Sequence, residues 1–379
     1  MTKLRFLFFL LLTAFLVGCG VSTPQLTIRN AEEQQSITAG WGDYQDWIDA
    51  EDPNQGIPLE RVLYSSGFRV IDRVEFVLQD GKKRNEQWLD IAQQTYWLSD
   101  GSISINGETI LPTQVTINES DLVKEADFSI TDLAPAILDA LDLPLSEGMK
   151  IANLHFPKTQ HVIFIFLDAF GYTIYQEAIA KLDLPYISTF SEPMLGITVY
   201  PPVTRVATAA ILSGLTPQEN GVVSREVRGT EARTIFDIFE EEGSSYDIIE
   251  GNTLYLNNLS AETLHLTADA NESGSTDDEI FAQAMRTIQT DLPDFLWVHY
   301  HGIDDAGHTY GLWSDEYNRT LLEIDGMLRR MVEVSPTGTV IMITADHGMH
   351  TTSGEGRLGD HGLLVAEDMF IPLFSLYKQ

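Results

Sequence analysis

The second half of the sequence alternates short, almost continuous apolar runs with longer amphipathic stretches. The runs include HVIFIFLD, LGITVY, YDIIEGN, DFLWVHYHG and TVIMITAD, and stretches such as DDEIFAQAMRTIQT and EYNRTLLEIDGMLRRMVE lie between them. Strands that are apolar along their whole length are typical of a parallel sheet that helices cover on both faces. The pattern therefore predicts an α/β domain over residues 128–379, with a mostly parallel sheet sandwiched by helices.

The segment ITDLAPAILDALDLP, residues 130–144, predicts the first helix of this domain. Either Thr131 or Asp132 is a candidate N-cap, because a side-chain oxygen at that position can accept a hydrogen bond from a free backbone N–H. Pro135 then falls in the first turn, where proline is tolerated.

Residues 44–127 follow a different pattern. Alternating apolar and polar segments flank the pairs Asp80-Gly81 and Asn106-Gly107, which are strong signals for tight hairpin turns. This stretch therefore predicts a small β-rich accessory module, and it carries no group of residues that indicates catalysis.

The N-terminus predicts export and lipid attachment. Lys3 and Arg5 precede an apolar run, and the run ends in LVGC at residues 16–19, which resembles a bacterial lipobox. We expect a signal peptide over residues 1–18, a lipid on Cys19 and a tether over residues 19–43. The protein would then be extracytoplasmic and anchored to a membrane, in the periplasm or at the cell surface. An ordinary signal peptide or a plain anchor is the alternative.

Cysteine content and charge exclude several kinds of function. Cys19 is the only cysteine, so an intrachain disulfide, a thiolate metal site and a cysteine nucleophile are excluded from the mature fold. The formal net charge is −33, and no run rich in lysine and arginine offsets it. A chain this acidic repels nucleic acid, so no nucleic-acid polymer is expected as a partner.

Three of the apolar runs end on acidic residues or histidine, at the edge of an α/β sheet where ligands bind. A later glycine-flanked segment, GDHG, adds one more histidine. The residues are Asp168, Asp304, His308, Asp346, His347 and His361. A strand-end aspartate alone is more often a helix cap, and a single loop histidine is more often a surface residue. Together, three carboxylates and three imidazoles predict a site for two divalent ions, most naturally Zn²⁺, with Mn²⁺ as the alternative.

A threonine at the start of a helix is the candidate nucleophile. Thr204 follows Pro201 and Pro202, which we expect to end a strand, and VATAAILSG then predicts a helix. A hydroxyl at a helix N-terminus lies where an anion binds well, and a metal ion lowers its pKa. Thr208, one turn further, is the weaker candidate because a hydroxyl inside a helix usually bonds to its own backbone.

These segments resemble the alkaline phosphatase superfamily, and within it the type I phosphodiesterase/nucleotide pyrophosphatase branch. The segments that match are PPVT at 201–204, IDDAGH at 303–308, ADHGM at 345–349 and GDHG at 359–362. The resemblance implies that Asp304, His308 and His361 hold one ion, and that Asp168, Asp346 and His347 hold the other. It also implies that Thr204 touches the second ion and attacks a small phosphate-ester substrate, forming a phospho-threonine.

The sequence departs from that branch in two ways. Relatives carry an asparagine 21 residues after the nucleophile, whereas this chain has Arg225 there, directly suited to clamping two phosphate oxygens. Arg225 would favour phosphate monoesters, unless it points to solvent and pairs with Glu226 or Glu231. The TDLAP helix also precedes the first core strand, whereas it follows the last one in relatives, which predicts a circular permutation.

The alternatives differ in what the site would do. A sulfatase needs cysteine or serine at position 204, and a phosphosugar mutase normally works in the cytosol, so both rank below a phosphoesterase. The remaining alternative is a lipoprotein that binds metal and phosphate without turnover, which the loss of the asparagine favours. We expect His299, His301 and His350 to support the ligands. His155, His161 and His265 are expected to be structural or on the surface.

Overall fold

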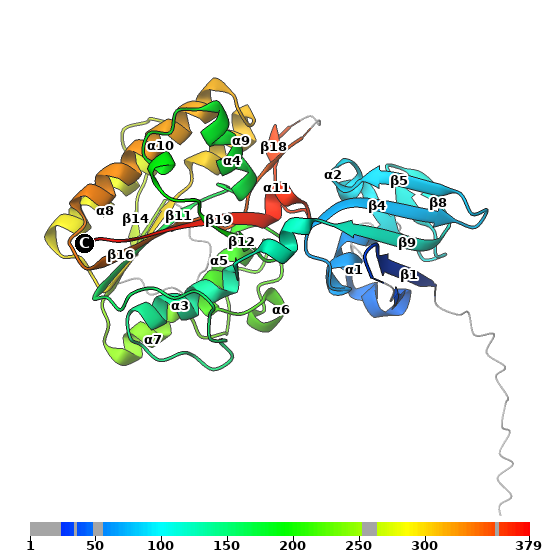
Figure 1. Ribbon diagram of the computed structural model, residues 1–379, viewed down its shortest axis with the longest axis horizontal. Helices are drawn as coiled ribbons and strands as arrows, with labels where there is room; N and C mark the ends of the chain where they lie inside the picture. Colours follow the sequence, from blue (N-terminus) through cyan, green and yellow to red (C-terminus); the bar gives the residue numbers. More distant parts are fainter. Residues whose placement is uncertain (1–23, 34–35, 48–55, 252–263, 353–355) are drawn as a thin grey trace, which may run out of the picture.

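The computed structural model describes residues 24–33, 36–47, 56–251, 264–352 and 356–379. Figure 1 shows a large lobe that contains one extended sheet and a smaller β-rich lobe beside it. Residues 1–23, which include the predicted signal peptide and Cys19, lie outside the described residues. Within the described ranges, none of the helices has the length and apolarity needed to cross a bilayer.

The large sheet is mostly parallel, as the sequence predicts. Its strand order is β10-β12-β19-β16-β11-β15-β13-β14, and β19 alone of these eight runs antiparallel to its neighbours. The bounds are Phe128–Ser129 for β10, Met194–Ile197 for β12, Phe370–Tyr377 for β19, Thr339–Thr344 for β16, His161–Leu167 for β11, Phe295–Tyr300 for β15, Tyr246–Glu250 for β13 and Leu264–Leu266 for β14.

Helices cover both faces of this sheet. Figure 1 shows α4, α8, α9 and α10 on one side and α3, α5 and α7 on the other. The bounds are Leu133–Ala140 for α3, Tyr172–Lys181 for α4, Thr204–Ser213 for α5, Pro217–Asn220 for α6, Ile235–Glu242 for α7, Asp277–Thr290 for α8, Gly302–Tyr310 for α9, Asp315–Val334 for α10 and Ala366–Met369 for α11. The short 3-10 helices of this lobe are η4 at Ile130–Asp132 and η5 at Ile187–Thr189.

The central strands are apolar because both of their faces are buried. In β11, every residue from Val162 to Leu167 is fully buried. Phe164 of β11 stacks on Trp297 of β15, with ring centroids 5.0 Å apart. Each large apolar side chain buried in this way contributes roughly 1.5–3 kcal/mol to stability. This rigid core holds the ends of β11, β15 and β16 side by side.

The smaller lobe consists of two antiparallel-rich sheets and two short helices. One sheet has the order β2-β1-β9-β4-β5, and the other has the order β3-β6-β7-β8. The bounds are Ser36–Gly40 for β2, Gln25–Asn30 for β1, Pro112–Glu119 for β9, Ile71–Leu78 for β4, Lys83–Gln87 for β5, Ile57–Pro58 for β3, Thr95–Trp97 for β6, Ile103–Ile105 for β7, Glu108–Ile110 for β8, Leu59–Ser65 for α1 and Trp88–Ile91 for α2; the 3-10 helices are η1 at Trp41–Trp47, η2 at Ala92–Gln94 and η3 at Asp121–Glu125. Both predicted hairpin turns, at Asp80-Gly81 and Asn106-Gly107, are confirmed.

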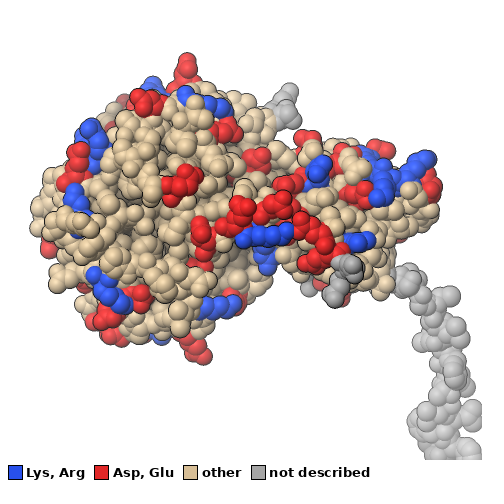
Figure 2. All heavy atoms as spheres, viewed as in Figure 1, with Lys and Arg blue, Asp and Glu red and all other residues tan. Residues whose placement is uncertain are grey.

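Hydrogen bonds join the two lobes near the site described below. The Ile71 backbone N–H donates to the Leu364 carbonyl at 2.7 Å, and the Leu364 N–H donates to the buried Glu60 carboxylate. The Tyr200 hydroxyl also lies 3.4 Å from Glu60 Oε2. On the face seen in Figure 2, acidic side chains gather where the two lobes meet. The smaller lobe is therefore fixed directly against the loop that follows β18 (Gly359–Asp360).

The structure corrects three local predictions. Residues 25–30 and 36–40 form strands, so the prediction of a tether over residues 19–43 is wrong there, because β1 pairs in register with β9. The helix predicted over residues 130–144 is instead η4 followed by the shorter α3, and Ser129 caps it while Asp132 completes the capping box. The strand expected to end at Pro201 and Pro202 ends earlier, at Ile197. The predicted circular permutation stays a prediction.

Candidate metal centre

Three neighbouring strands deliver five of the six predicted ligands to one edge of the large sheet. Asp168 follows β11, and the adjacent pair Asp346 and His347 follows β16. Asp304 and His308 lie four residues apart on α9, which begins two residues after β15. The parallel pairing of β11 with both β15 and β16 aligns the ends of all three strands. Sheet register therefore brings the three strand ends together, and α9 adds Asp304 and His308 at the same edge.

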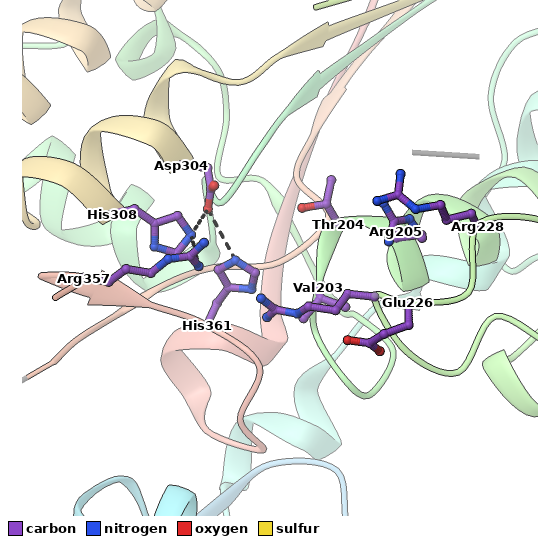
Figure 3. Close-up of a pocket in the computed structure, with 10 residues that line it drawn as sticks. Val203, Thr204, Arg205, Glu226, Arg228, Asp304, His308, Arg357 and His361 are labelled. Carbon is purple, nitrogen blue, oxygen red and sulfur yellow. Dashed lines mark hydrogen bonds and ion pairs between the residues drawn. The ribbon is translucent and has the colours of Figure 1, made fainter. Parts of the chain in front are cut away.

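The first cluster consists of Asp304, His308 and His361. Oδ1 of Asp304 lies 3.3 Å from Nε2 of His308 and 3.5 Å from Nε2 of His361. Dashed lines in Figure 3 mark both contacts. The spacing of four residues puts Asp304 and His308 on one face of α9.

The second cluster consists of Asp168, Asp346 and His347. Nε2 of His347 lies 3.0 Å from Oδ2 of Asp346 and 3.6 Å from Oδ1 of Asp168. All three side chains are buried. In each cluster the carboxylate and imidazole atoms lie close enough together for one ion to bind them all.

All three histidines have their ring orientation fixed in the same way. Nδ1 donates to a backbone carbonyl in each case: His308 to Gly359 at 2.7 Å, His347 to Gly348 at 2.9 Å, and His361 to Pro202 at 2.9 Å. With Nδ1 bonded in this way, Nε2 of each ring faces an aspartate of its cluster. This is the usual arrangement of a metal-ligating histidine, in which the second ring nitrogen is held by a hydrogen bond.

Two carboxylate oxygens in the clusters have no hydrogen-bond donor among the described residues. They are Oδ1 of Asp304 and Oδ2 of Asp346, and both are buried. A buried carboxylate oxygen without a partner is costly unless a cation satisfies it. The donor set of oxygens and imidazole nitrogens suits two divalent ions. The residues therefore fit the expected divalent ions.

Two members of the second cluster, Asp346 and His347, have raised pKa values, because the negative charge of the cluster favours bound protons. Burial opposes a charge on His347, but Asp346 and Asp168 raise the pKa of His347 to about 10. Burial and the nearby Asp168 raise the pKa of Asp346. Protons thus collect where a cation would bind, and metal binding would displace them.

The first cluster differs because His361 is disposed to be neutral. Burial and the nearby His347 hold the pKa of His361 well below its usual value. The two rings stack with centroids 3.8 Å apart and an angle of 18° between their planes. This contact joins the first cluster to the second, so the two groups form one continuous centre.

Thr204 is the first residue of α5, and its hydroxyl faces the second cluster. Its Oγ1 lies 3.4 Å from Oδ1 of Asp168 and 3.3 Å from Nε2 of His347. The N-terminus of a helix favours negative charge, because its first backbone N–H groups have no partner within the helix. A hydroxyl in this position is thus close to two candidate metal ligands, and it lies at a helix N-terminus, where an anion binds well.

Thr208 lies elsewhere. It is buried, and its Oγ1 has no hydrogen-bond partner among the described residues, so the expected bond to its own helix backbone is absent. Unlike Thr204, Thr208 does not line the cavity at this edge of the sheet.

A cavity of about 570 Å³ opens in front of Thr204 and the first cluster. Four arginines line it, namely Arg205, Arg225, Arg228 and Arg357. Figure 3 shows Thr204 between the first cluster on one side and Arg205 and Arg228 on the other. Arg225 is exposed, and the described ion pairs do not include one to Glu226 or Glu231. In a chain of net charge −33, this concentration of cations indicates an anionic ligand.

A second layer of buried residues supports Asp168. Oδ2 of Asp168 lies 3.4 Å from Nε2 of His299 and 3.8 Å from Nδ1 of His301. On the other side of His299, Nδ1 lies 2.8 Å from Glu250. Burial alone would raise the pKa of Asp168, but the contacts with His299, His301 and His347 hold it well below its ordinary value. Asp168 is thus kept ionised and oriented, as a metal ligand must be.

The remaining histidines have local roles. Nδ1 of His350 bonds to the buried Asp368 at 2.8 Å, so His350 supports the loop beside the centre. His161 bonds to the Pro293 carbonyl at 2.9 Å, His265 lies 3.6 Å from Asp247, and His155 is exposed.

Sequence reasoning missed Glu250, Arg228 and Arg357. Glu250 ends a buried strand, β13, so the rule that found Asp168 would have found it too. No pattern in the sequence singles out the two arginines, because loops far apart in the chain bring them to the cavity.

The part of the chain that resembles known proteins carries five of the six cluster residues, all but Asp168. Residues 262–369 match the family described as type I phosphodiesterase / nucleotide pyrophosphatase. Over 97 residues, 26% of this chain, the sequence is 29% identical to the catalytic subunit of human GPI ethanolamine phosphate transferase 3. It is 33% identical over 86 residues to GPI ethanolamine phosphate transferase 2 of Schizosaccharomyces pombe. The chain spans only 9% and 11% of the length of these two relatives.

Solved structures of other proteins resemble this chain at low sequence identity. Murine ectonucleotide pyrophosphatase/phosphodiesterase 5 in complex with AMP is 13% identical, with a TM-score of 0.47 over 57% of this chain and 87% of that one. Phosphonoacetate hydrolase from Sinorhizobium meliloti is 16% identical, with a TM-score of 0.43 over 55% of this chain and 61% of that one. The match over residues 262–369 makes this segment of the chain similar to the type I phosphodiesterase/nucleotide pyrophosphatase family.

Proposed function

We propose that this protein hydrolyses small phosphate esters, with Thr204 as the nucleophile and two divalent ions held by the two clusters. The observation that carries the proposal is the position of Thr204 Oγ1, 3.4 Å from Asp168 and 3.3 Å from His347, at the mouth of a cavity lined by arginines. A nucleophile, two ligand sets and an anion pocket converge there.

The bound ions, the N-terminus of α5 and Thr204 would each have a separate role in the reaction. The bound ions would supply a lowered pKa at the Thr204 hydroxyl and charge stabilisation at the phosphoryl oxygens. The N-terminus of α5 orients Thr204 toward the phosphate. Thr204 Oγ1 loses its proton and forms a bond to phosphorus, while the bond from phosphorus to the leaving oxygen breaks with its electron pair on that oxygen, which takes up a proton and departs as an alcohol. Water then attacks phosphorus, the bond from phosphorus to Oγ1 breaks, and phosphate is released as Oγ1 regains a proton.

The arginines favour a substrate with a highly charged phosphate. A guanidinium can bind two phosphate oxygens in a bidentate manner. Arg225 occupies the position where relatives have an asparagine, and it lines the cavity beside Arg205. We therefore propose that the protein prefers phosphate monoesters to diesters.

We also propose that the protein acts outside the cytoplasm, attached through a lipid on Cys19. The support is the LVGC segment after a short apolar run that two basic residues precede. Membrane fractionation of wild type and Cys19→Ala tests this. The wild type should sediment with membranes, and the variant should not carry lipid; a lipid-free wild-type chain would contradict the proposal.

A panel of phosphate mono- and diesters and sulfate esters, assayed with Zn²⁺ or Mn²⁺, tests the activity. We expect turnover of phosphate esters and none of sulfate esters. The second candidate is a binding protein without turnover, which the Arg225 substitution favours. Two bound ions with no turnover of any ester would support that candidate instead.

A further inference from the structure

A second cavity adjoins the one in front of Thr204. It has a volume of about 580 Å³ and lies between the smaller lobe and the loop around β18. Arg357 lines both cavities. Four polar residues of the smaller lobe form the opposite wall, namely Asp90, Gln93, Gln94 and Asn106. We call this cavity the junction groove.

The wall contributed by the smaller lobe is held in a fixed position. The bonds from Ile71 and Glu60 to Leu364 tie that lobe to the chain three residues after the ligand His361. His350, which also lines the junction groove, is buried and locked by Asp368. The groove is therefore a built feature with a defined relation to the metal centre.

The direction in which the leaving group departs follows from the proposed function, on which this inference rests. In an in-line displacement, the attacking and leaving oxygens lie on opposite sides of phosphorus, and ions held by the two clusters would stabilise the charge on them. Thr204 lies against the second cluster. The leaving oxygen then lies on the side of the first cluster, which includes His308.

Arg357 lies between the first cluster and the junction groove, since it contacts His308 and lines both cavities. Its Nη1 lies 3.0 Å from Nε2 of His308, and its other neighbour is Asp360, 3.4 Å away. Both Arg357 and Asp360 line the junction groove. A leaving group longer than a few atoms that departs past His308 therefore enters this groove.

The chemistry of the groove indicates what kind of group it accepts. The carboxamides of Gln93, Gln94 and Asn106 both donate and accept hydrogen bonds. The carboxylates of Asp90 and Asp360 accept only, and they repel a further anion. Hydroxyl groups are both donors and acceptors and carry no charge, so they match such a lining.

We propose that the smaller lobe and the loop around β18 form a subsite for a hydroxyl-rich leaving alcohol, such as a sugar or polyol. The reacting phosphate is bound in the first cavity, and the alcohol carbon chain occupies the junction groove. The accessory lobe thus selects the substrate by its leaving group.

The test compares two monoesters that differ in the leaving group. Glucose 1-phosphate would fill the junction groove, whereas methyl phosphate would not reach it. The variant Gln93→Ala/Gln94→Ala removes two exposed side chains whose loss leaves the backbone bonds of η2 intact. The matched control is Gln87→Ala, because Gln87 is also exposed, precedes α2 and makes no side-chain cap bond.

We expect the double variant to lower kcat/KM for glucose 1-phosphate by about 10-fold, with methyl phosphate unchanged within about 2-fold, since each lost hydrogen bond has a modest effect. Gln87→Ala should leave both values unchanged. An equal effect on both esters, or no effect on either, would overturn the subsite. A selective loss for ethanolamine phosphate instead would overturn its assignment to hydroxyl groups. If the wild type turned over neither ester, the proposed function itself would be contradicted. Failure of the subsite alone would instead leave the wild type active and appear only in the comparison with the variants.

Discussion

Gly171 and Gly348 pack backbone against backbone beneath the second cluster. A Cβ atom added at Gly171 would lie 2.5 Å from the Gly348 Cα, and one added at Gly348 would lie 2.0 Å from the Glu367 carbonyl oxygen. The Gly348 N–H also donates to the Asp368 carbonyl at 2.9 Å. The loops after β11 and β16 can touch only because neither residue has a side chain. This contact brings Asp168 within 3.6 Å of His347.

Gly348→Ala should therefore damage the second cluster more than the first. The added methyl group meets rigid backbone, so the loops must separate and Asp168 must move away from His347. We expect a lower melting temperature and loss of about one ion per chain, measured by thermal unfolding and elemental analysis. Gly326→Ala on α10 is the control, because a Cβ there meets nothing within 4 Å. Full metal content in Gly348→Ala would contradict the expectation.

Thr204→Ala should lower phosphate-ester turnover by at least about 100-fold, as loss of a group that acts at the reacting atom usually does. Metal content should stay the same, since Thr204 is not needed to hold either cluster together. Thr208→Ala is the matched control, one helical turn away and also buried. A larger loss of turnover in Thr208→Ala than in Thr204→Ala would identify Thr208 as the nucleophile instead.

Each cluster should lose its own ion when its aspartate becomes asparagine. We expect Asp304→Asn and Asp346→Asn to bind about one ion per chain where the wild type binds two, because the buried carboxylate that attracts each cation is neutralised. Asp315→Asn, on an exposed turn at the start of α10, should bind two. Excess chelator should abolish turnover, and full activity in chelator would count against both clusters as catalytic sites.

Replacement of Arg225 should separate monoesters from diesters. Because a guanidinium binds the extra charge of a monoester, we expect Arg225→Ala to lower kcat/KM for monoesters about 10-fold more than for diesters. Arg225→Asn should shift the preference further toward diesters. Arg233→Ala, at an exposed arginine that pairs with Glu241, is the control. An equal fall in kcat/KM for monoesters and diesters would show that Arg225 does not distinguish substrates by their charge.

Glu60 should make the free energy of unfolding depend on pH. Burial raises the pKa of Glu60 from 4.5 to about 7, although the Leu364 N–H opposes the shift. Below the lower value, the carboxyl is protonated in both the folded and the unfolded chain. As pH rises between the two values, the unfolded chain releases the proton first, so stability falls. Above the upper value the loss is constant, on the order of 3 kcal/mol.

Glu60→Gln should remove this part of the pH dependence. Urea unfolding at pH 5 and pH 8 should show a smaller difference in the variant than in the wild type. The control is Glu108→Gln on the exposed strand β8. Identical pH profiles for the wild type and Glu60→Gln would show that Glu60 is not the group responsible.

The sequence predicts most of the large lobe because its signals are strong and local. Runs such as HVIFIFL are apolar on both faces, so only a covered, mostly parallel sheet can bury them. Five of the six predicted ligands come together for the same reason, since strand ends in a parallel sheet share one edge. The sixth, His361, is brought there by the loop that follows β18. Asp168 and His347 are 179 residues apart in sequence order and touch because β11 and β16 are neighbours.

Other features depend on partners far away in the chain, which no local pattern reveals. Residues 25–30 look irregular, yet they form a strand because β9 supplies their hydrogen bonds. Ser129 caps the first helix because the helix follows β10 directly and so begins before Thr131 and Asp132, the predicted caps. Arg357 reaches His308 only through the turn before β18, so its role could not be read from sequence spacing.

The place of β19 in the large sheet has a consequence for synthesis. Phe370–Tyr377 lies between β12 and β16, both of which leave the ribosome earlier. Until β19 arrives, those two strands expose open backbone edges that can pair with other chains. Completion of the sheet must therefore wait until translation has passed Tyr377, and a factor that shields the nascent strands during that interval would raise the yield of folded protein.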